Sequence, residues 1–110
     1  MMLSTLFDKL NGITELSGKV RYRAFEPGNL PSPPYVCYLE TGSDNFIADN
    51  KVYNAGESID IELYNSKRDF ALEAKIEKAL ADLELPWSRS DSYQTSEEVY
   101  LIIYSTTIRR

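Results

Sequence analysis

The fold is decided by the stretch from Ser43 to Leu80, SDNFIADNKVYNAGESIDIELYNSKRDFALEAKIEKAL. Its first third places Asp, Asn and Gly around two short apolar pieces, a composition that predicts a protruding hairpin or long loop. The middle third, SIDIELY, alternates apolar with polar residues and predicts a strand. The last third has apolar residues at helical spacing. We therefore expect a sheet with a helix packed on one face.

The predicted strand and helix each present one apolar face. The strand directs Ile59, Ile61 and Leu63 to the same side. The helix carries an apolar stripe, with its charged residues largely outside it. The stripe consists of Leu72, Ile76, Ala79, Leu80 and Leu83, and the charged residues are Glu73, Glu77, Lys78 and Asp82. Asn65 or Ser66 is expected to cap the start, and Pro86 lies beyond the end.

The flanking sequence adds a shorter helix and further strands. Leu3, Leu6, Phe7 and Leu10 recur at helical spacing and predict an N-terminal helix that ends near Gly12. The segment 20–25 predicts a strand whose cations, Lys19, Arg21 and Arg23, lie on one solvated face. A proline-bearing connector over 26–34 precedes a strand over 35–41, and segment 87–108 predicts two strands joined by a turn near 94–97.

The last predicted strand, which begins around Val99, is apolar on both faces. Val99, Leu101 and Ile103 alternate with Tyr100, Ile102 and Tyr104. With two helices available, we expect the tyrosine-bearing face, which Tyr38 and Tyr64 would share, to be covered either by a partner or by loops and the first helix. The fold class is α+β: a single mixed or mostly antiparallel sheet with an N-terminal helix, a longer amphipathic helix and a protruding hairpin or long loop.

Composition narrows the possible functions. A chain of 110 residues fits one domain, 1–110, and it lacks an apolar run of the roughly 20 residues that a membrane helix needs. The start, MMLSTLFDKL, does not resemble a signal peptide, so we expect a cytoplasmic origin. The net charge of -5 argues against specific nucleic-acid binding.

Catalytic and metal sites are also disfavoured. Histidine, the commonest general base and zinc ligand, is absent, and Cys37, the only cysteine, is expected to be a buried apolar side chain. Asp60 and Glu62 share a strand face, but a solvated sheet face explains them better than a sugar-cleaving pair. The Asp and Asn residues of the loop do not have the spacing of a helix-loop-helix calcium site. We predict no catalytic residues, no cofactor and no metal.

Three segments resemble the tail-completion or tail-terminator proteins of long-tailed bacteriophages. They are PPYVCYLETGSDNFIADNKVY, IDIELYNSKRDFALEAKIEKAL and YQTSEEVYLIIYSTTI, which lie in this order between Leu30 and Ile108. The resemblance implies a compact α/β subunit that assembles as a ring, commonly a hexamer, at the head-proximal end of the tail tube. Such a ring ends tube polymerisation and joins the tail to the head. The chain departs from many relatives by ending soon after its last strand.

The resemblance also implies partners and an interface. The expected partners are further copies of the chain, the tail-tube protein and a head-side connector protein, with no membrane, in the virion at the tail-head junction. A neck stopper or adaptor is the alternative, and a small-ligand-binding or enzymatic domain is a more distant one. The segment expected to protrude carries Ser43, Asp44, Asn45, Phe46, Ala48, Asp49, Asn50 and Tyr53. The predicted assembly residues are Asp44, Asn45, Phe46, Asp49, Asn50, Tyr53, Tyr64, Tyr100 and Tyr104.

Overall fold

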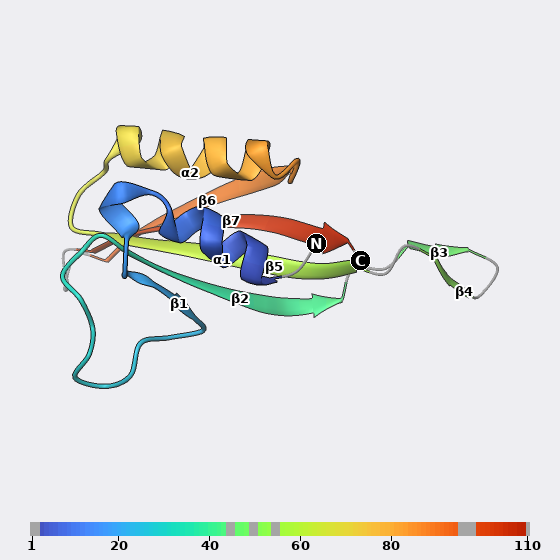
Figure 1. Cartoon of the computed structure of the whole chain (residues 1–110), viewed down its shortest axis with the longest axis horizontal. Coiled ribbons are helices and arrows are strands. Elements are labelled where there is room, and N and C mark those ends of the chain that lie inside the picture. Colours follow the sequence, from blue (N-terminus) through green and yellow to red (C-terminus); the bar gives the residue numbers. More distant parts are fainter. Residues whose placement is uncertain (1–2, 44–45, 49–50, 54–55, 95–98, 110) are drawn as a thin grey trace.

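The computed structural model describes residues 3–43, 46–48, 51–53, 56–94 and 99–109 (Figure 1). Over these residues the chain forms a five-stranded mixed sheet with two helices, which confirms the predicted α+β class. In chain order the elements are α1 (Leu3–Asn11), a short 3-10 helix η1 (Thr14–Leu16), β1 (Val20–Tyr22), β2 (Tyr35–Ser43), β3 (Phe46–Ala48), β4 (Lys51–Tyr53), β5 (Gly56–Asn65), α2 (Phe70–Asp82), β6 (Trp87–Gln94) and β7 (Val99–Arg109).

The main sheet has the strand order β1-β2-β5-β7-β6. β1 pairs with β2 in parallel, and the other three pairs are antiparallel. β5 and β7 form the longest ladder, from Gly56 opposite Arg109 to Asn65 opposite Tyr100. β5 therefore lies at the centre of the sheet, and β1 and β6 form its two margins.

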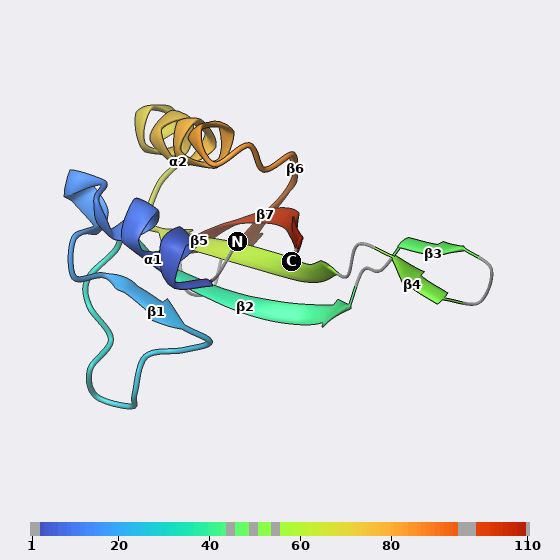
Figure 2. The ribbon, with the colours of Figure 1, turned by 45° about the vertical axis from the view of Figure 1, so that its right-hand side comes forward.

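Both helices pack on the same face of the sheet (Figures 1 and 2). The apolar residues of α1 and α2 meet those of β2, β5 and β7 in one core. Leu10, Ile76 and Leu80 of the helices and Ile61 and Ile102 of the strands are at most 1% exposed. Burying one such side chain contributes about 2 kcal/mol, so this contact holds the helices in place. Among the described residues, no helix is long and apolar enough to cross a membrane.

The start of α2 differs from the expectation. Asp69 caps the helix by accepting a hydrogen bond from the Leu72 amide at 3.1 Å, whereas Asn65 belongs to β5 and is buried. Glu73, which the helical pattern placed outside the apolar stripe, is only 2% exposed. Its burial follows from ion pairs with arginines outside the helix, which the periodicity of the helix alone does not contain.

β1 is shorter than the predicted strand. Arg23 has φ 67°, a left-handed backbone conformation that a regular strand does not contain. The strand consequently ends at Tyr22, and residues 23–34 form the loop that returns the chain to β2.

The predicted hairpin or long loop contains a second small sheet. β3 and β4 pair antiparallel, with Phe46 opposite Tyr53 and Ile47 opposite Val52. The two strands lie beyond the ends of β2 and β5, away from the helices and the main sheet (Figures 1 and 2). We call β3 and β4 the extension; it lies at one end of a molecule 49 Å long and 28 Å wide.

Candidate assembly surface

The predicted assembly residues fall into two groups. Phe46 and Tyr53 occupy opposite positions in the extension. Asp44, Asn45, Asp49 and Asn50 lie outside the described residues. The remaining three, Tyr64, Tyr100 and Tyr104, belong to the main sheet. The structure therefore divides the predicted interface between the extension and the sheet.

Tyr104 is a core residue. It is 0% exposed, its hydroxyl donates to Glu77 Oε2 at 2.7 Å, and its ring meets Trp87 edge-on at 5.3 Å between centroids. Burial and the bond to the Glu77 carboxylate raise the pKa of the Tyr104 phenol. A side chain enclosed under α2 is unable to meet a partner, so the expectation of an interface role is wrong for Tyr104.

Tyr64 lies on the opposite face from Tyr104. Ile61 pairs with Tyr104, so the alternation along β5 sends Tyr64 to the other side of the sheet. Tyr64 stacks on Tyr35 with 4.9 Å between ring centroids, and its hydroxyl donates to Glu62 Oε1 at 3.2 Å. Burial and the adjacent Glu62 carboxylate raise the pKa of Tyr64 to about 12.

The tyrosines therefore do not share one face, contrary to the expectation. Tyr38, opposite Ile61 in the β2–β5 register, lies under the helices, and Tyr100 has the same side-chain direction as Tyr104 along β7. Tyr100 is half-buried, with its ring centroid 4.3 Å from that of Tyr93 on β6. The face that lacks helices is the one that carries Tyr64.

We call this second side of the main sheet the open face. Its apolar side chains come from three adjacent strands and are buried or half-buried. They are Tyr35, Cys37, Leu39, Tyr64, Val99, Leu101 and Ile103. Phe25, from the loop after β1, meets Tyr35 edge-on at 5.5 Å. Asp60, Glu62 and Ser105 lie on the same side, so the apolar area is concentrated around Tyr35, Tyr64 and Leu101. Such an area without a covering helix is suited to association with another protein.

Cys37 fits its expected place in the sheet. It is 5% exposed on β2, and burial raises the pKa of its thiol. A buried thiol with a raised pKa is a poor nucleophile, because the thiolate is the reactive form.

An ion cluster around the buried Glu73 joins α2 to the β6 margin, and the sequence reasoning missed it. Arg68 holds the Glu73 carboxylate through two hydrogen bonds, of 2.9 and 3.1 Å, and Arg89 lies 3.8 Å from the same carboxylate. Hydrogen bonding to Glu73 raises the pKa of the Arg68 guanidinium. Arg68 and Arg89 both reach Asp91 as well, at 3.4 and 3.2 Å. The cluster attaches the first turn of α2 to the last strand of the sheet.

The described surface contains concavities that lack a reactive grouping. One of them, about 780 Å³, lies between the end of β7 and the segment that links α2 to β6. Asp60 of β5 lines this concavity, and its carboxylate accepts a hydrogen bond from the Ser105 hydroxyl at 2.7 Å. Among the described residues, no three His, Cys, Asp or Glu side chains gather as metal ligands.

The chain resembles a solved structure over nearly its whole length. No model of a protein family matches the sequence, and no curated protein matches it. The fold matches a chain of a structure titled "Virion of native gene transfer agent (GTA) particle", with a TM-score of 0.63 and 16% sequence identity. The match covers 98% of this chain and 92% of that one. At this identity the likeness establishes a shared fold.

Proposed function

We propose that this chain is a non-enzymatic structural subunit of a phage-like particle. Several copies form a ring, a hexamer by the resemblance described above, at the head-proximal end of the tail tube. The ring ends tube polymerisation and joins the tail to a head-side connector protein. Before assembly the subunit resides in the cytoplasm of the host cell.

Two independent likenesses support this proposal. The sequence segments between Leu30 and Ile108 resemble tail-terminator proteins. The fold resembles a chain of a gene transfer agent virion over 98% of the present chain. Both point to a component of a phage-like particle.

The observation that carries the assembly role is the extension. Its two strands contain three residues each, Phe46–Ala48 and Lys51–Tyr53, and lie beyond the main sheet (Figure 1). An isolated two-stranded hairpin is at best marginally stable in water. We therefore assign the contact that stabilises the extension to another subunit, and its sequence, which includes Phe46 and Val52, offers apolar residues for that contact.

The open face provides a second contact region. A subunit of a ring meets neighbours on two sides and the tube and connector on the other two. The extension and the open face are separate surfaces of the same chain, so one subunit is able to make contacts of both kinds. Apolar area on the open face would favour association through its removal from water.

Electron microscopy of polymerising tail-tube subunits tests the proposal. Wild-type protein is expected to give tubes of arrested length with added density at one end. Phe46→Asp is expected to remove the cap, because it places a charge where an apolar contact forms. Ala74→Asp, at an exposed position of α2, is the matched control and should cap normally.

Two results would contradict the terminator role. Tubes that grow without arrest, with no added density at either end, would exclude it. If the protein binds the connector without affecting the tubes, a neck stopper or adaptor is the better assignment. A cap that survives Phe46→Asp would remove the extension from the contact.

A further inference from the structure

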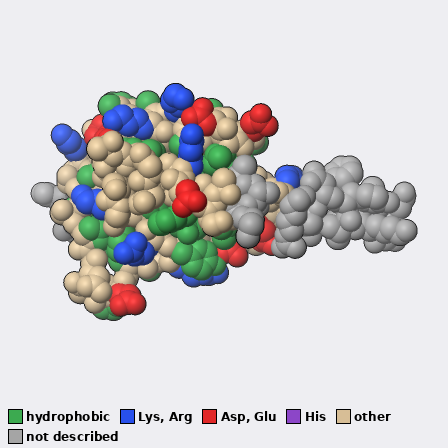
Figure 3. Space-filling model, viewed as in Figure 1, with side chains coloured by type: hydrophobic (Ala, Val, Ile, Leu, Met, Phe, Trp, Pro, Cys, Tyr) green, Lys and Arg blue, Asp and Glu red, His purple; other side chains and the backbone are tan. Residues whose placement is uncertain are grey.

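The surface around the helices has its charges paired within the chain. Basic and acidic side chains are interspersed over this surface (Figure 3). Lys9, Lys75 and Lys78 each form an ion pair with a carboxylate, at 2.7 to 3.2 Å. Exposed pairs of this kind leave little charge for a partner to bind, so the margins of the sheet are the more informative part of the surface.

The β1 margin is obstructed. β1 contains three residues and is followed by Arg23, whose φ of 67° takes the chain out of the strand conformation. Beyond β1, the pairing of β2 with β5 shifts its register between Glu40 and Gly42. Short edge strands and bulges both hinder the addition of a further strand. This margin is therefore poorly suited to pairing with another chain.

The β6 margin, by contrast, is regular and exposed. Its eight residues pair with β7 from Trp87 opposite Thr106 to Gln94 opposite Val99, without a shift in register. All side chains over 87–93 are exposed, and the strand contains neither lysine nor proline. Over the described part of the chain, residues 87–94 make no main-chain hydrogen bond outside their ladder with β7. The outer edge of β6 is thus a continuous row of main-chain groups open to a further strand.

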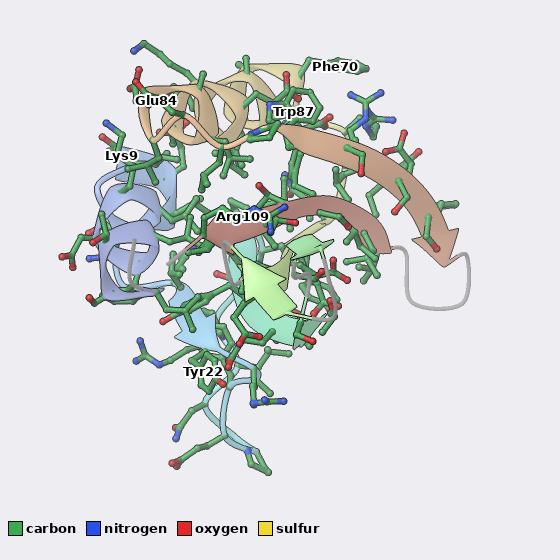
Figure 4. All side chains as sticks on the ribbon, turned by 90° about the vertical axis from the view of Figure 1, so that its right-hand side faces the viewer. Lys9, Tyr22, Phe70, Glu84, Trp87 and Arg109 are labelled. Atoms are coloured by element: carbon green, nitrogen blue, oxygen red, sulfur yellow. The ribbon has the colours of Figure 1, made fainter. Side chains whose placement is uncertain are left out.

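Two exposed aromatic rings lie near the two ends of this edge. Trp87 is 38% exposed and Tyr93 is 48% exposed. Trp87 meets the Tyr104 ring at 5.3 Å and Tyr93 meets the Tyr100 ring at 4.3 Å, so both are held in place by β7. Trp87 lies at the margin opposite to that of Tyr22 (Figure 4). Aromatic rings that are already ordered bury area at a small cost in conformational entropy.

The sequence of the exposed edge, WSRSDSY, is self-complementary about Ser90. One position away from Ser90 are residues of opposite charge, two positions away are serines, and three positions away are aromatic residues. When two copies of this strand run antiparallel around a two-fold axis at Ser90, each residue on one side faces its counterpart on the other. The facing pairs are Arg89 with Asp91, Ser88 with Ser92, and Trp87 with Tyr93.

We propose that the β6 margin binds the β6 margin of a second copy, in an antiparallel pairing centred on Ser90, so that the two main sheets become one continuous sheet. This register overlaps all the exposed positions 87–93, and it adds an aromatic cross-strand pair at each end. The contact uses neither the extension nor the open face. It therefore goes beyond the terminator role and describes the free subunit.

The charged residues of β6 select the register and do not drive the contact. Arg89 and Asp91 already pair within one chain at 3.2 Å, so neither brings an unsatisfied charge to the interface. Centring on Ser90 sets unlike charges across the two strands. Centring on Arg89 or on Asp91 would instead set two like charges directly opposite each other, which is destabilising.

Analytical ultracentrifugation over a series of concentrations tests the dimer. Wild-type protein is expected to dimerise reversibly. Ser90→Lys places two lysines across the two-fold axis and should raise the dissociation constant about tenfold or more. Ser4→Lys, at an exposed position of α1, is the matched control and should dimerise like wild type. Wild-type protein that stays monomeric throughout, or a dimer that Ser90→Lys does not weaken, would overturn the proposal.

A charge-swap experiment tests the position of the axis. Ser90→Asp alone should also weaken the dimer, since two aspartates then face each other. Mixing it with Ser90→Lys should restore association, because unlike charges meet at the axis in the mixed dimer. A mixture that associates no better than either variant alone would overturn the pairing centred on Ser90. So would a dimer that survives both Ser90 variants and is lost in Phe46→Asp, since it would belong to the extension.

The assay contains no tail tubes, so its outcome is independent of the proposed function. A dimer that responds to the Ser90 variants would stand even if the protein failed to cap tubes. Capped tubes formed by a protein that does not dimerise would retain the terminator role and remove the β6 contact.

Discussion

Tyr64 and Tyr104 show that the alternating side-chain direction along a strand determines whether a residue lies in the core or on the open face. The two side chains belong to adjacent strands, yet Tyr104 lies in the core and Tyr64 on the open face. Sequence alternation identified the two faces of β7 but not the one that the helices cover. That choice depends on the register of β5 against β7, which pairs residues about 40 positions apart, such as Ile61 with Tyr104.

Tyr64 provides a pH prediction. Its pKa is raised to about 12 from the ordinary value of 10.0, so the folded state retains the proton that the unfolded state loses. This contribution to stability is complete below pH 10 and is lost as the pH rises through 12. Absorbance titration should detect a late phenolate transition that Tyr64→Phe removes. A wild-type titration with every folded tyrosine ionising near pH 10 would contradict the prediction.

At the scale of elements, α2 is attached to the sheet at its first turn by charge as well as by apolar packing. Glu73 is buried and held by Arg68 on one side and approached by Arg89 on the other. A buried carboxylate that loses a partner incurs the cost of its desolvation. The cluster therefore links the integrity of α2 to that of β6.

Arg68→Ala is expected to lower the free energy of unfolding by about 2 kcal/mol, because two charge-assisted hydrogen bonds to Glu73 are lost. Urea denaturation measures the change. Lys67→Ala, at the exposed neighbouring position, is the control and should stay within about 0.5 kcal/mol of wild type. Equal stability of both variants would show that the cluster is dispensable.

At the scale of the whole molecule, the extension and the body are separable. The core cluster comes from α1, η1, α2, the strands β1, β2, β5 and β7, and the segment that follows α2. Ser43 and Glu57 pair directly across the base of the extension. The body should therefore fold without β3 and β4.

Replacing residues 44–55 with an Asn-Gly turn tests this separation. Such a turn suits a tight connection between antiparallel strands. The melting temperature is expected to remain within a few degrees of wild type, by thermal circular dichroism, while tube capping is lost. A variant that fails to fold would instead make the extension part of the folding unit.

The sequence predicted the elements better than their arrangement. The strand around Ile59 and the helix around Ile76 have strong local patterns, and both formed as expected. The parallel pairing of β1 with β2, the capping by Asp69 and the burial of Glu73 were not foreseen. Each of these depends on contacts between segments or on backbone geometry that no short window of sequence contains.

For the candidate assembly surface, the sequence likewise predicted some features and missed others. Turn-forming residues around two short apolar pieces predicted the extension. The division of the tyrosines between two faces required the sheet register, and the ion cluster around Glu73 required the salt bridges themselves.

The reactivity of Cys37 reports on local opening of the open face. It is the only thiol in the chain, it lies 5% exposed on the open face, and Phe25 from the neighbouring loop lies close to it through its backbone. A thiol reagent therefore reaches it only when that loop or the adjacent strand edge opens. The rate of Cys37 labelling would thus measure local breathing of one sheet face, and slower labelling in the presence of tail tubes would record protection of that face without any engineered probe.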